Sequence, residues 1–174
     1  MAKADEGGLG RWEEVINGTI HMMEPADFET HQNLVHKVIQ VLKNQLENTA
    51  YKVYGSGVGL EIDMENNFVP DAFIALESMI KEEGGVAGTP YLLAEVISQE
   101  TQDRDRGYKK DLYAKVGIKE YWVVSPYSNS LEVYHLTESH LDSGSYLLKG
   151  TYAGKDSFDT YGLAGYHIDV SQIF

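Results

Sequence analysis

Hydrophobic and polar positions alternate in the first patterned stretch of the chain, residues 11–23. Val15, Ile20 and Met22 are separated by polar residues, and Asn17-Gly18 stands between the two halves. Asn-Gly favours a tight hairpin turn, because both residues adopt positive φ at low cost. We therefore predict a hairpin, or a strand with a turn, over residues 11–23.

A helical period follows from about residue 28 to residue 46. Apolar residues recur there at spacings of three and four, which gives the segment one apolar face. The residues on that face are Leu34, Val38, Val41, Leu42 and Gln45. We predict a helix that buries this face, with Asp27 or Thr30 as its N-cap.

From residue 52 the pattern changes to short runs typical of strands. These runs are residues 52–54, 60–64, 68–76, 91–97, 120–124 and 131–135, with turn residues at 55–57 and 65–67. The run 91–97 is apolar except for Glu95, which predicts a buried central strand. Residues 78–90 are polar and end in a glycine-rich stretch, so we expect a mobile loop that closes over a substrate. Residues 146–174 are expected to form short strands joined by glycine turns.

Residues 101–116 predict a second helix, capped by Ser98 or Thr101 and ended by Gly117. The order of helix, strands, helix and strands indicates an α/β fold, in which a central mixed sheet is flanked by helices. A chain of 174 residues fits one domain. We assign residues 11–174 to that domain and residues 1–10 to a flexible N-terminus.

The chain contains no cysteine, which excludes disulfides, zinc–cysteine sites and thiol nucleophiles. No window approaches the ~20 apolar residues that a membrane-spanning helix needs. The polar N-terminus lacks the apolar segment of a signal peptide. We therefore expect a cytoplasmic protein without a membrane partner.

The formal net charge of −13 argues against a simple nucleic-acid binder, because phosphate contacts come from Lys and Arg. The basic residues are nevertheless concentrated in one segment. Between residues 104 and 119 the chain carries Arg104, Arg106, Lys109, Lys110, Lys115 and Lys119. Acidic residues lie among them, so this segment is either a basic surface for a phosphodiester backbone or a solvated helix face.

Two carboxylates stand in otherwise apolar runs. Asp71 follows Pro70, and Glu95 interrupts the run 91–97. A charge in such a place is costly unless it is paired or binds a metal ion. Two nearby carboxylates on neighbouring strands favour a hard divalent cation, Mg²⁺ or Mn²⁺. The histidines have no zinc-site spacing.

Lys109 has two interpretations. It stands four residues after Asp105, which is the spacing of an ion pair on an exposed helix. It also stands beside Tyr108 and near Leu112, on the apolar side of the predicted helix, from which its amine would reach the ends of the strands. The sequence leaves both interpretations open.

Several segments together resemble the Uma2 family, a restriction-endonuclease-like group within the PD-(D/E)XK nuclease superfamily. They are Pro-Asp at 70–71, Glu-Val-Ile-Ser at 95–98, Asp-Arg-Gly-Tyr-Lys at 105–109, Leu-Tyr-Ala at 112–114 and Gly-Ile-Lys-Glu-Tyr-Trp-Val-Val at 117–124. Residues 12–18 resemble the family's opening segment and residues 168–174 its end. The resemblance spans nearly the whole chain, and residues 95–124 are its most specific part.

The resemblance implies a restriction-endonuclease-like core and a set of roles. Asp71 and Glu95 would be metal ligands, the Val96 carbonyl a third oxygen ligand, and Glu14 a further carboxylate. The superfamily's lysine stands two residues after the glutamate, where this chain has Ile97, so Lys109 would supply the amine from the following helix. His31 and Tyr113 match recurrent positions without an assigned role.

We accordingly expect a Mg²⁺-dependent endonuclease that hydrolyses DNA, with Asp71, Glu95, Lys109 and Glu14 at the catalytic centre. Cutting both strands would favour a homodimer. A non-catalytic, nuclease-like binding or assembly module is the alternative, favoured by the interrupted motif and the acidic charge. A nuclease acting on RNA or a nucleotide is a third hypothesis, because no base-recognition motif is present.

Overall fold

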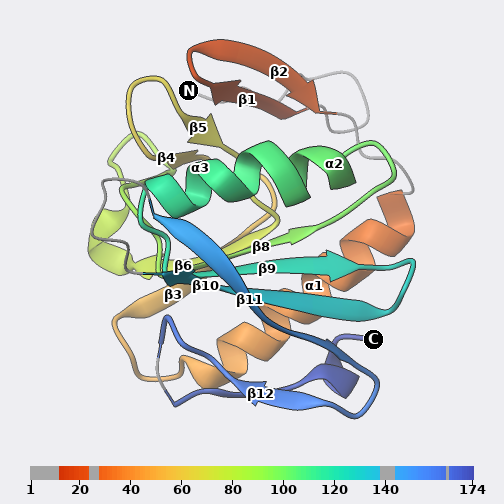
Figure 1. The fold of residues 1–174 in the computed structure, drawn as a ribbon. Helices are drawn as coiled ribbons and strands as arrows, with labels where there is room; N and C mark the ends of the chain where they lie inside the picture. Colours follow the sequence, from red (N-terminus) through yellow and green to blue (C-terminus); the bar gives the residue numbers. More distant parts are fainter. Residues whose placement is uncertain (1–11, 24–27, 138–143, 164) are drawn as a thin grey trace.

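A six-stranded mixed sheet runs through the centre of the protein, in the strand order β11-β10-β9-β8-β6-β3 (Figure 1). The structure is a computed structural model that describes residues 12–23, 28–137, 144–163 and 165–174. Its central strands are β3 (Tyr51–Gly55), β6 (Ala72–Leu76), β8 (Leu92–Val96), β9 (Glu120–Ser125), β10 (Ser130–Thr137) and β11 (Ser145–Ala153). The predicted flexible segment 1–10 lies outside the described residues.

Strands β8 and β9 form the parallel pair of this sheet, and all their residues are buried. A parallel pair needs a crossover connection. Here the connection is a helical segment made of α2 (Gln102–Arg104), a π-helical turn η2 (Asp105–Lys109) and α3 (Lys110–Lys115). The helix predicted over 101–116 is confirmed, and Gly117 ends it with a φ of 87°. The π-helical turn within it is not visible in the sequence pattern.

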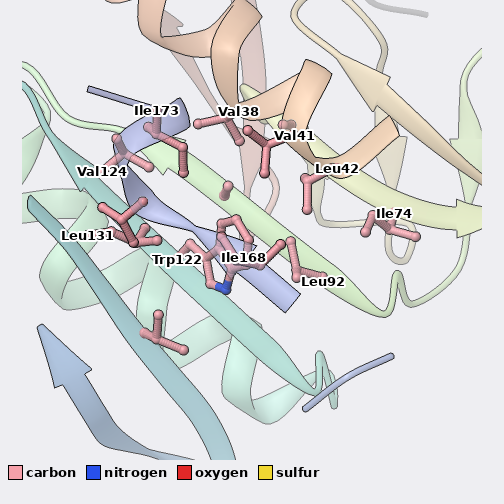
Figure 2. Packing of buried hydrophobic residues seen from close by; sticks show 14 of the residues in the cluster. Val38, Val41, Leu42, Ile74, Leu92, Trp122, Val124, Leu131, Ile168 and Ile173 are labelled. Atoms are coloured by element: carbon pink, nitrogen blue, oxygen red, sulfur yellow. The ribbon is translucent and has the colours of Figure 1, made fainter. Parts of the chain in front are cut away.

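Helix α1 (Phe28–Gln45) packs against one face of the sheet. Figure 2 shows Val38, Val41 and Leu42 of this helix gathered with Trp122 and Leu92 of the sheet. The predicted helix and its apolar face are confirmed. Thr30 lies inside the helix and therefore does not cap it, and Asp27 lies outside the described residues.

The opposite face of the sheet is covered by the α2–α3 segment and a second, five-stranded sheet. The strands of this smaller sheet are β1 (Trp12–Ile16), β2 (Thr19–Met23), β4 (Leu60–Glu61), β5 (Asn67–Phe68) and β7 (Val86–Ala87). Figure 1 shows the β1–β2 hairpin lying above the helical segment. The predicted hairpin is confirmed, with Asn17 and Gly18 at φ values of 48° and 72°.

The predicted strand 68–76 is divided in the structure. Phe68 ends β5 in the smaller sheet, whereas Ala72 begins β6 in the central sheet. Pro70 lies at the break, because proline has no N–H for a strand ladder and restricts the residue before it. This change of sheet places Asp71 directly before β6.

Residues 78–90, predicted as a mobile loop, are mostly turns and irregular backbone in the structure, with two short regular elements. A short 3₁₀ helix, η1 (Glu77–Met79), is followed by β7, which pairs in parallel with β4. Gly85 has a φ of 80°, and a Cβ there would lie 3.0 Å from the Gly59 carbonyl oxygen. The glycine-rich stretch therefore packs against the neighbouring strand, and its closure over a substrate stays a prediction. The predicted strand 60–64 is also shorter, since β4 ends at Glu61.

The C-terminal residues complete the α1 side of the core. Strands β12 (Ser157–Asp159) and β13 (His167–Asp169) pair with each other, and η3 (Val170–Gln172) follows. Ile168 and Ile173 are buried in the same cluster as Trp122 (Figure 2). Among the described residues, no helix is both long and apolar enough to cross a membrane.

Candidate active site

Asp71 and Glu95 lie side by side where the antiparallel strands β6 and β8 pair, with Asp71 directly before β6. The register pairs Ala72 with Ala94, so the next positions outward are Asp71 and Glu95. An Asp71 side-chain oxygen, Oδ2, accepts a hydrogen bond from the Val96 N–H at 2.8 Å. The Asp71 N–H donates in turn to Glu95 Oε2 at 3.3 Å. The two carboxylates therefore meet at one end of the sheet instead of pointing to opposite faces.

Lys109 reaches this pair from the helical segment and is buried, with 2% of its side chain exposed. Its Nζ lies 3.1 Å from Glu95 Oε1 and 3.0 Å from Glu14 Oε1. The Asp105 carboxylate is 3.8 Å away. Both interpretations of Lys109 are thus partly right: the i,i+4 pair with Asp105 exists, but it is buried at the sheet instead of exposed.

Glu14 comes from β1 in the smaller sheet and is 1% exposed. Its Oε1 accepts hydrogen bonds from Lys109 and, at 3.1 Å, from the Val69 N–H. Its Oε2 is buried and has no hydrogen-bond partner within the described part of the chain. The carboxylate predicted from the N-terminal segment therefore does reach the cluster.

Three further residues contact the cluster, and the sequence did not assign them a place in it. His31 Nε2 of α1 lies 3.2 Å from Asp71 Oδ2. The Tyr113 hydroxyl donates to Glu95 Oε1 at 2.8 Å. Asp105 is 3% exposed, and its backbone carbonyl accepts from the Tyr121 hydroxyl. The sequence could have indicated Asp105, because it stands four residues before Lys109. No local pattern in the sequence indicates the long-range contact between His31 and Asp71.

The electrostatics of this cluster are dominated by its carboxylates. Burial raises the pKa of Glu95 to about 8, against the opposing effect of Lys109, and the neighbouring carboxylates add to the rise. Burial also raises the pKa of Asp105. For Lys109, burial would lower the pKa, but Glu95, Glu14 and Asp105 outweigh it and raise the pKa above its ordinary value. Lys109 is therefore charged, and the carboxylates around it exceed the positive charge that it brings.

The pKa of His31 is also raised. Burial lowers it, but the hydrogen bond and charge of Asp71, the charge of Glu95 and a hydrogen bond with the Val96 backbone together prevail. The Asp71 carboxylate and the Val96 backbone thus both face His31 at the open side of the cluster. Asp71 is the more exposed of the two strand carboxylates, at 16% of its side chain compared with 5% for Glu95.

The donor set fits a hard divalent cation. Asp71, Glu95 and the Val96 carbonyl are oxygen donors of the kind that Mg²⁺ and Mn²⁺ prefer. Among the described residues, no group of three or more His, Asp or Glu side chains is arranged so that it could hold a metal ion. Mg²⁺ does not need one, since it keeps several waters and is held by one or two carboxylates together with substrate phosphates.

The basic residues between 104 and 119 do not form one continuous surface. Lys109 is buried in the cluster, and Arg106 makes a 2.6 Å ion pair with Glu132. Lys110 lies over the Tyr134 ring, with its Nζ 5.2 Å from the ring centroid. Lys115 and Lys119 are exposed, so this segment is neither one basic stripe nor a fully solvated face.

A mixed sheet that presents two carboxylates from adjacent strands to a buried lysine defines a restriction-endonuclease-like α/β protein. The chain belongs to the Uma2 family, whose model, described as "Putative restriction endonuclease", matches residues 3–170. The fold is also similar to the crystal structure of "a putative nuclease belonging to DUF820" from Anabaena variabilis ATCC 29413. That similarity has a TM-score of 0.71 at 14% identity and covers 94% of this chain and 89% of the other. No curated protein matches the sequence.

Proposed function

We propose that this protein is a Mg²⁺- or Mn²⁺-dependent endonuclease that hydrolyses phosphodiester bonds of DNA at the Asp71–Glu95 centre. The observation that carries the proposal is the excess of buried carboxylate over positive charge at one end of the sheet. Asp71, Glu95, Glu14 and Asp105 meet Lys109 and His31 there. Such an excess is relieved by protons or by a cation, and membership of a family described as "Putative restriction endonuclease" favours the cation.

Asp71, Glu95 and the Val96 carbonyl would hold the metal ion. A bound ion of this kind supplies a Lewis acid for the scissile phosphate and lowers the pKa of a coordinated water. Lys109 places a permanent positive charge 3.1 Å from Glu95, where it can orient the attacking water or stabilise negative charge that develops on the phosphate.

Glu14 and Tyr113 position these groups. Glu14 is fixed by the Val69 N–H and holds the Lys109 amine at 3.0 Å, so the amine has little freedom. Tyr113 donates to the same Glu95 oxygen that Lys109 contacts, which leaves the other oxygen, Oε2, directed to Asp71. Partners of this kind orient ligands and typically contribute tenfold to 100-fold in metal affinity or activity.

Cleavage of supercoiled plasmid tests the proposal. We expect nicking or cutting by the wild-type protein with Mg²⁺ or Mn²⁺ and none with chelator, and we expect Asp71→Asn and Glu95→Gln to abolish it. Glu47→Gln is the matched control, since it neutralises an exposed carboxylate beyond the end of α1. Equal cleavage by wild type, both site variants and the control would show a contaminating nuclease and contradict the proposal.

A non-catalytic, nuclease-like module is the second candidate. The observation that favours it is that Lys109 already contacts three carboxylates, so part of their charge is compensated without a metal. Calorimetric titration with Mn²⁺ separates the two. No heat of binding at millimolar metal, together with unchanged thermal unfolding in chelator, would favour the module over the enzyme.

Two further questions are tested separately: whether the protein also cleaves RNA, and whether it forms a homodimer. Structured and single-stranded RNA substrates are compared with DNA under the same metal conditions. Sedimentation equilibrium with and without DNA tests the dimer, which would place two centres on opposite strands of a duplex.

A further inference from the structure

A cleft of about 450 Å³ lies where the β1–β2 hairpin meets the helical segment that carries Lys109. Four of its lining residues come from the hairpin and two from the helical segment. They are Ile16, Asn17, Thr19, His21, Arg104 and Tyr108. Its volume is within the range of small-molecule sites, which is about 300–1,000 Å³.

The cleft adjoins the candidate active site along both elements. Ile16 stands two residues after Glu14 on β1, so the two side chains share a strand face and lie about 7 Å apart along it. Arg104 and Tyr108 directly precede Asp105 and Lys109 in the helical segment. The π-helical turn η2 spans this point, and such turns are frequent at functional sites. A nucleic-acid strand bound at the active site would therefore have a neighbouring nucleotide close to the cleft.

The lining chemistry suits a flat heterocycle attached to a phosphate. Tyr108 is an exposed aromatic side chain, 41% accessible, and Ile16 supplies an apolar floor. The Arg104 Nε is buried and has no hydrogen-bond partner among the residues that the structure describes. His21 and Asn17 add polar groups at the hairpin side. Aromatic rings stack on bases of any sequence, and arginine binds phosphate or stacks on the base plane.

We propose that this cleft binds one unpaired base of the nucleic-acid strand next to the scissile phosphate, with Tyr108 stacking on the base and Arg104 contacting its phosphate. The inference rests on the proposed nuclease function and adds a substrate preference to it. A paired base is not available for stacking, so the protein favours single strands, frayed ends or flipped bases over intact duplex. The contact reads a base face instead of a base edge, so it tolerates every sequence.

Binding is measured in chelator, where no cleavage occurs, by fluorescence anisotropy of a labelled single-stranded DNA and its duplex. We expect tighter binding of the single strand and a loss of about tenfold in affinity for Tyr108→Ala. Tyr108→Phe keeps the ring and is expected to bind within about twofold of wild type. Tyr127→Ala is the matched control, because it removes another exposed tyrosine, in the β9–β10 turn away from the cleft.

Salt dependence separates the two side chains. Arg104→Ala is expected to reduce the slope of log affinity against log salt by about 0.7, the value for one phosphate contact on a single strand. Tyr108→Ala is expected to leave that slope unchanged. Lys155→Ala, which removes an exposed charge in the β11–β12 turn, is the control for charge alone. A 2-aminopurine probe in the strand should lose its quenching in Tyr108→Ala, with RNA and DNA strands run in parallel.

The outcomes distinguish this inference from the proposed function. Equal affinities of Tyr108→Ala, Tyr127→Ala and wild type for the single strand would overturn the base-binding cleft even if the protein cleaves plasmid. Failure to bind any single strand would overturn it as well. Loss of stacking in Tyr108→Ala in a protein that never cleaves would support the cleft and contradict the nuclease function.

Discussion

Replacing Lys109 by methionine tests whether the buried charges at the end of the sheet behave as the structure implies. Methionine keeps most of the volume of the lysine stem and removes the charge. In the wild type, Nζ lies between Glu14 and Glu95 at 3.0 and 3.1 Å, with both partners at most 5% exposed. The substitution therefore leaves two buried carboxylates without their cation.

The size of the effect follows from this geometry. Removing one partner of a buried ion pair costs about 3–5 kcal/mol. In a chain of this length, 1 kcal/mol shifts the melting temperature by about 2–4 °C, so we expect Lys109→Met to melt about 6–20 °C below wild type in chelator. Lys109 opposes the rise in the pKa of Glu95 that burial causes, so without Lys109 that pKa rises further and this deficit should grow as the pH rises. When folding raises the pKa of a carboxyl group, ionisation of that group at higher pH lowers the stability of the native state.

Thermal unfolding gives the melting temperature and urea unfolding gives the free energy, both followed by tryptophan fluorescence with and without millimolar Mn²⁺. Two results are expected to accompany the loss of stability: a larger gain from Mn²⁺ in Lys109→Met than in wild type, and recovery of part of the loss when Glu14→Gln is added. Plasmid cleavage should fall about 100-fold to 1,000-fold. If Lys109→Met unfolds in chelator within about 0.5 kcal/mol of wild type, the account of the buried cluster is refuted.

Three further predictions concern other contacts. Tyr113→Phe removes only the hydroxyl that donates to Glu95 and should weaken Mn²⁺ binding about tenfold by calorimetry, and unchanged affinity would contradict its positioning role. Leu42→Ala, in the core on the α1 side, should lower the free energy of unfolding by about 2–5 kcal/mol without changing Mn²⁺ affinity, as measured in the same two assays. Burial raises the pKa of Glu120 above its ordinary value of about 4.5. The free energy of unfolding of wild type relative to Glu120→Gln should therefore fall as the pH rises through the raised pKa. Parallel profiles of unfolding free energy against pH for the two proteins would refute this.

The local patterns that predicted correctly are those with strong short-range chemistry. Asn17-Gly18 specified a hairpin turn because both positions need positive φ, and the period of α1 specified its buried face. The apolar run around Glu95 specified a central strand, and every residue of β8 is buried. The run 68–76 misled because an apolar pattern does not say which sheet a strand joins, and Pro70 separates two strands of different sheets.

The sequence by itself determined which residue types were available for the chemistry. It marked Asp71 and Glu95 as charges in apolar surroundings, and the family resemblance indicated Lys109 and Glu14. It could not determine that Glu14 and Lys109, 95 residues apart in the chain, share a hydrogen bond, or that His31 faces Asp71. Those contacts arise because the chain passes at Pro70 from β5 in the smaller sheet to β6 in the central sheet. In addition, the smaller sheet folds over the helical segment, and α1 starts at the same end of the central sheet. Tertiary packing alone decides such long-range meetings, since no periodicity along the chain records which distant side chains will occupy one buried space.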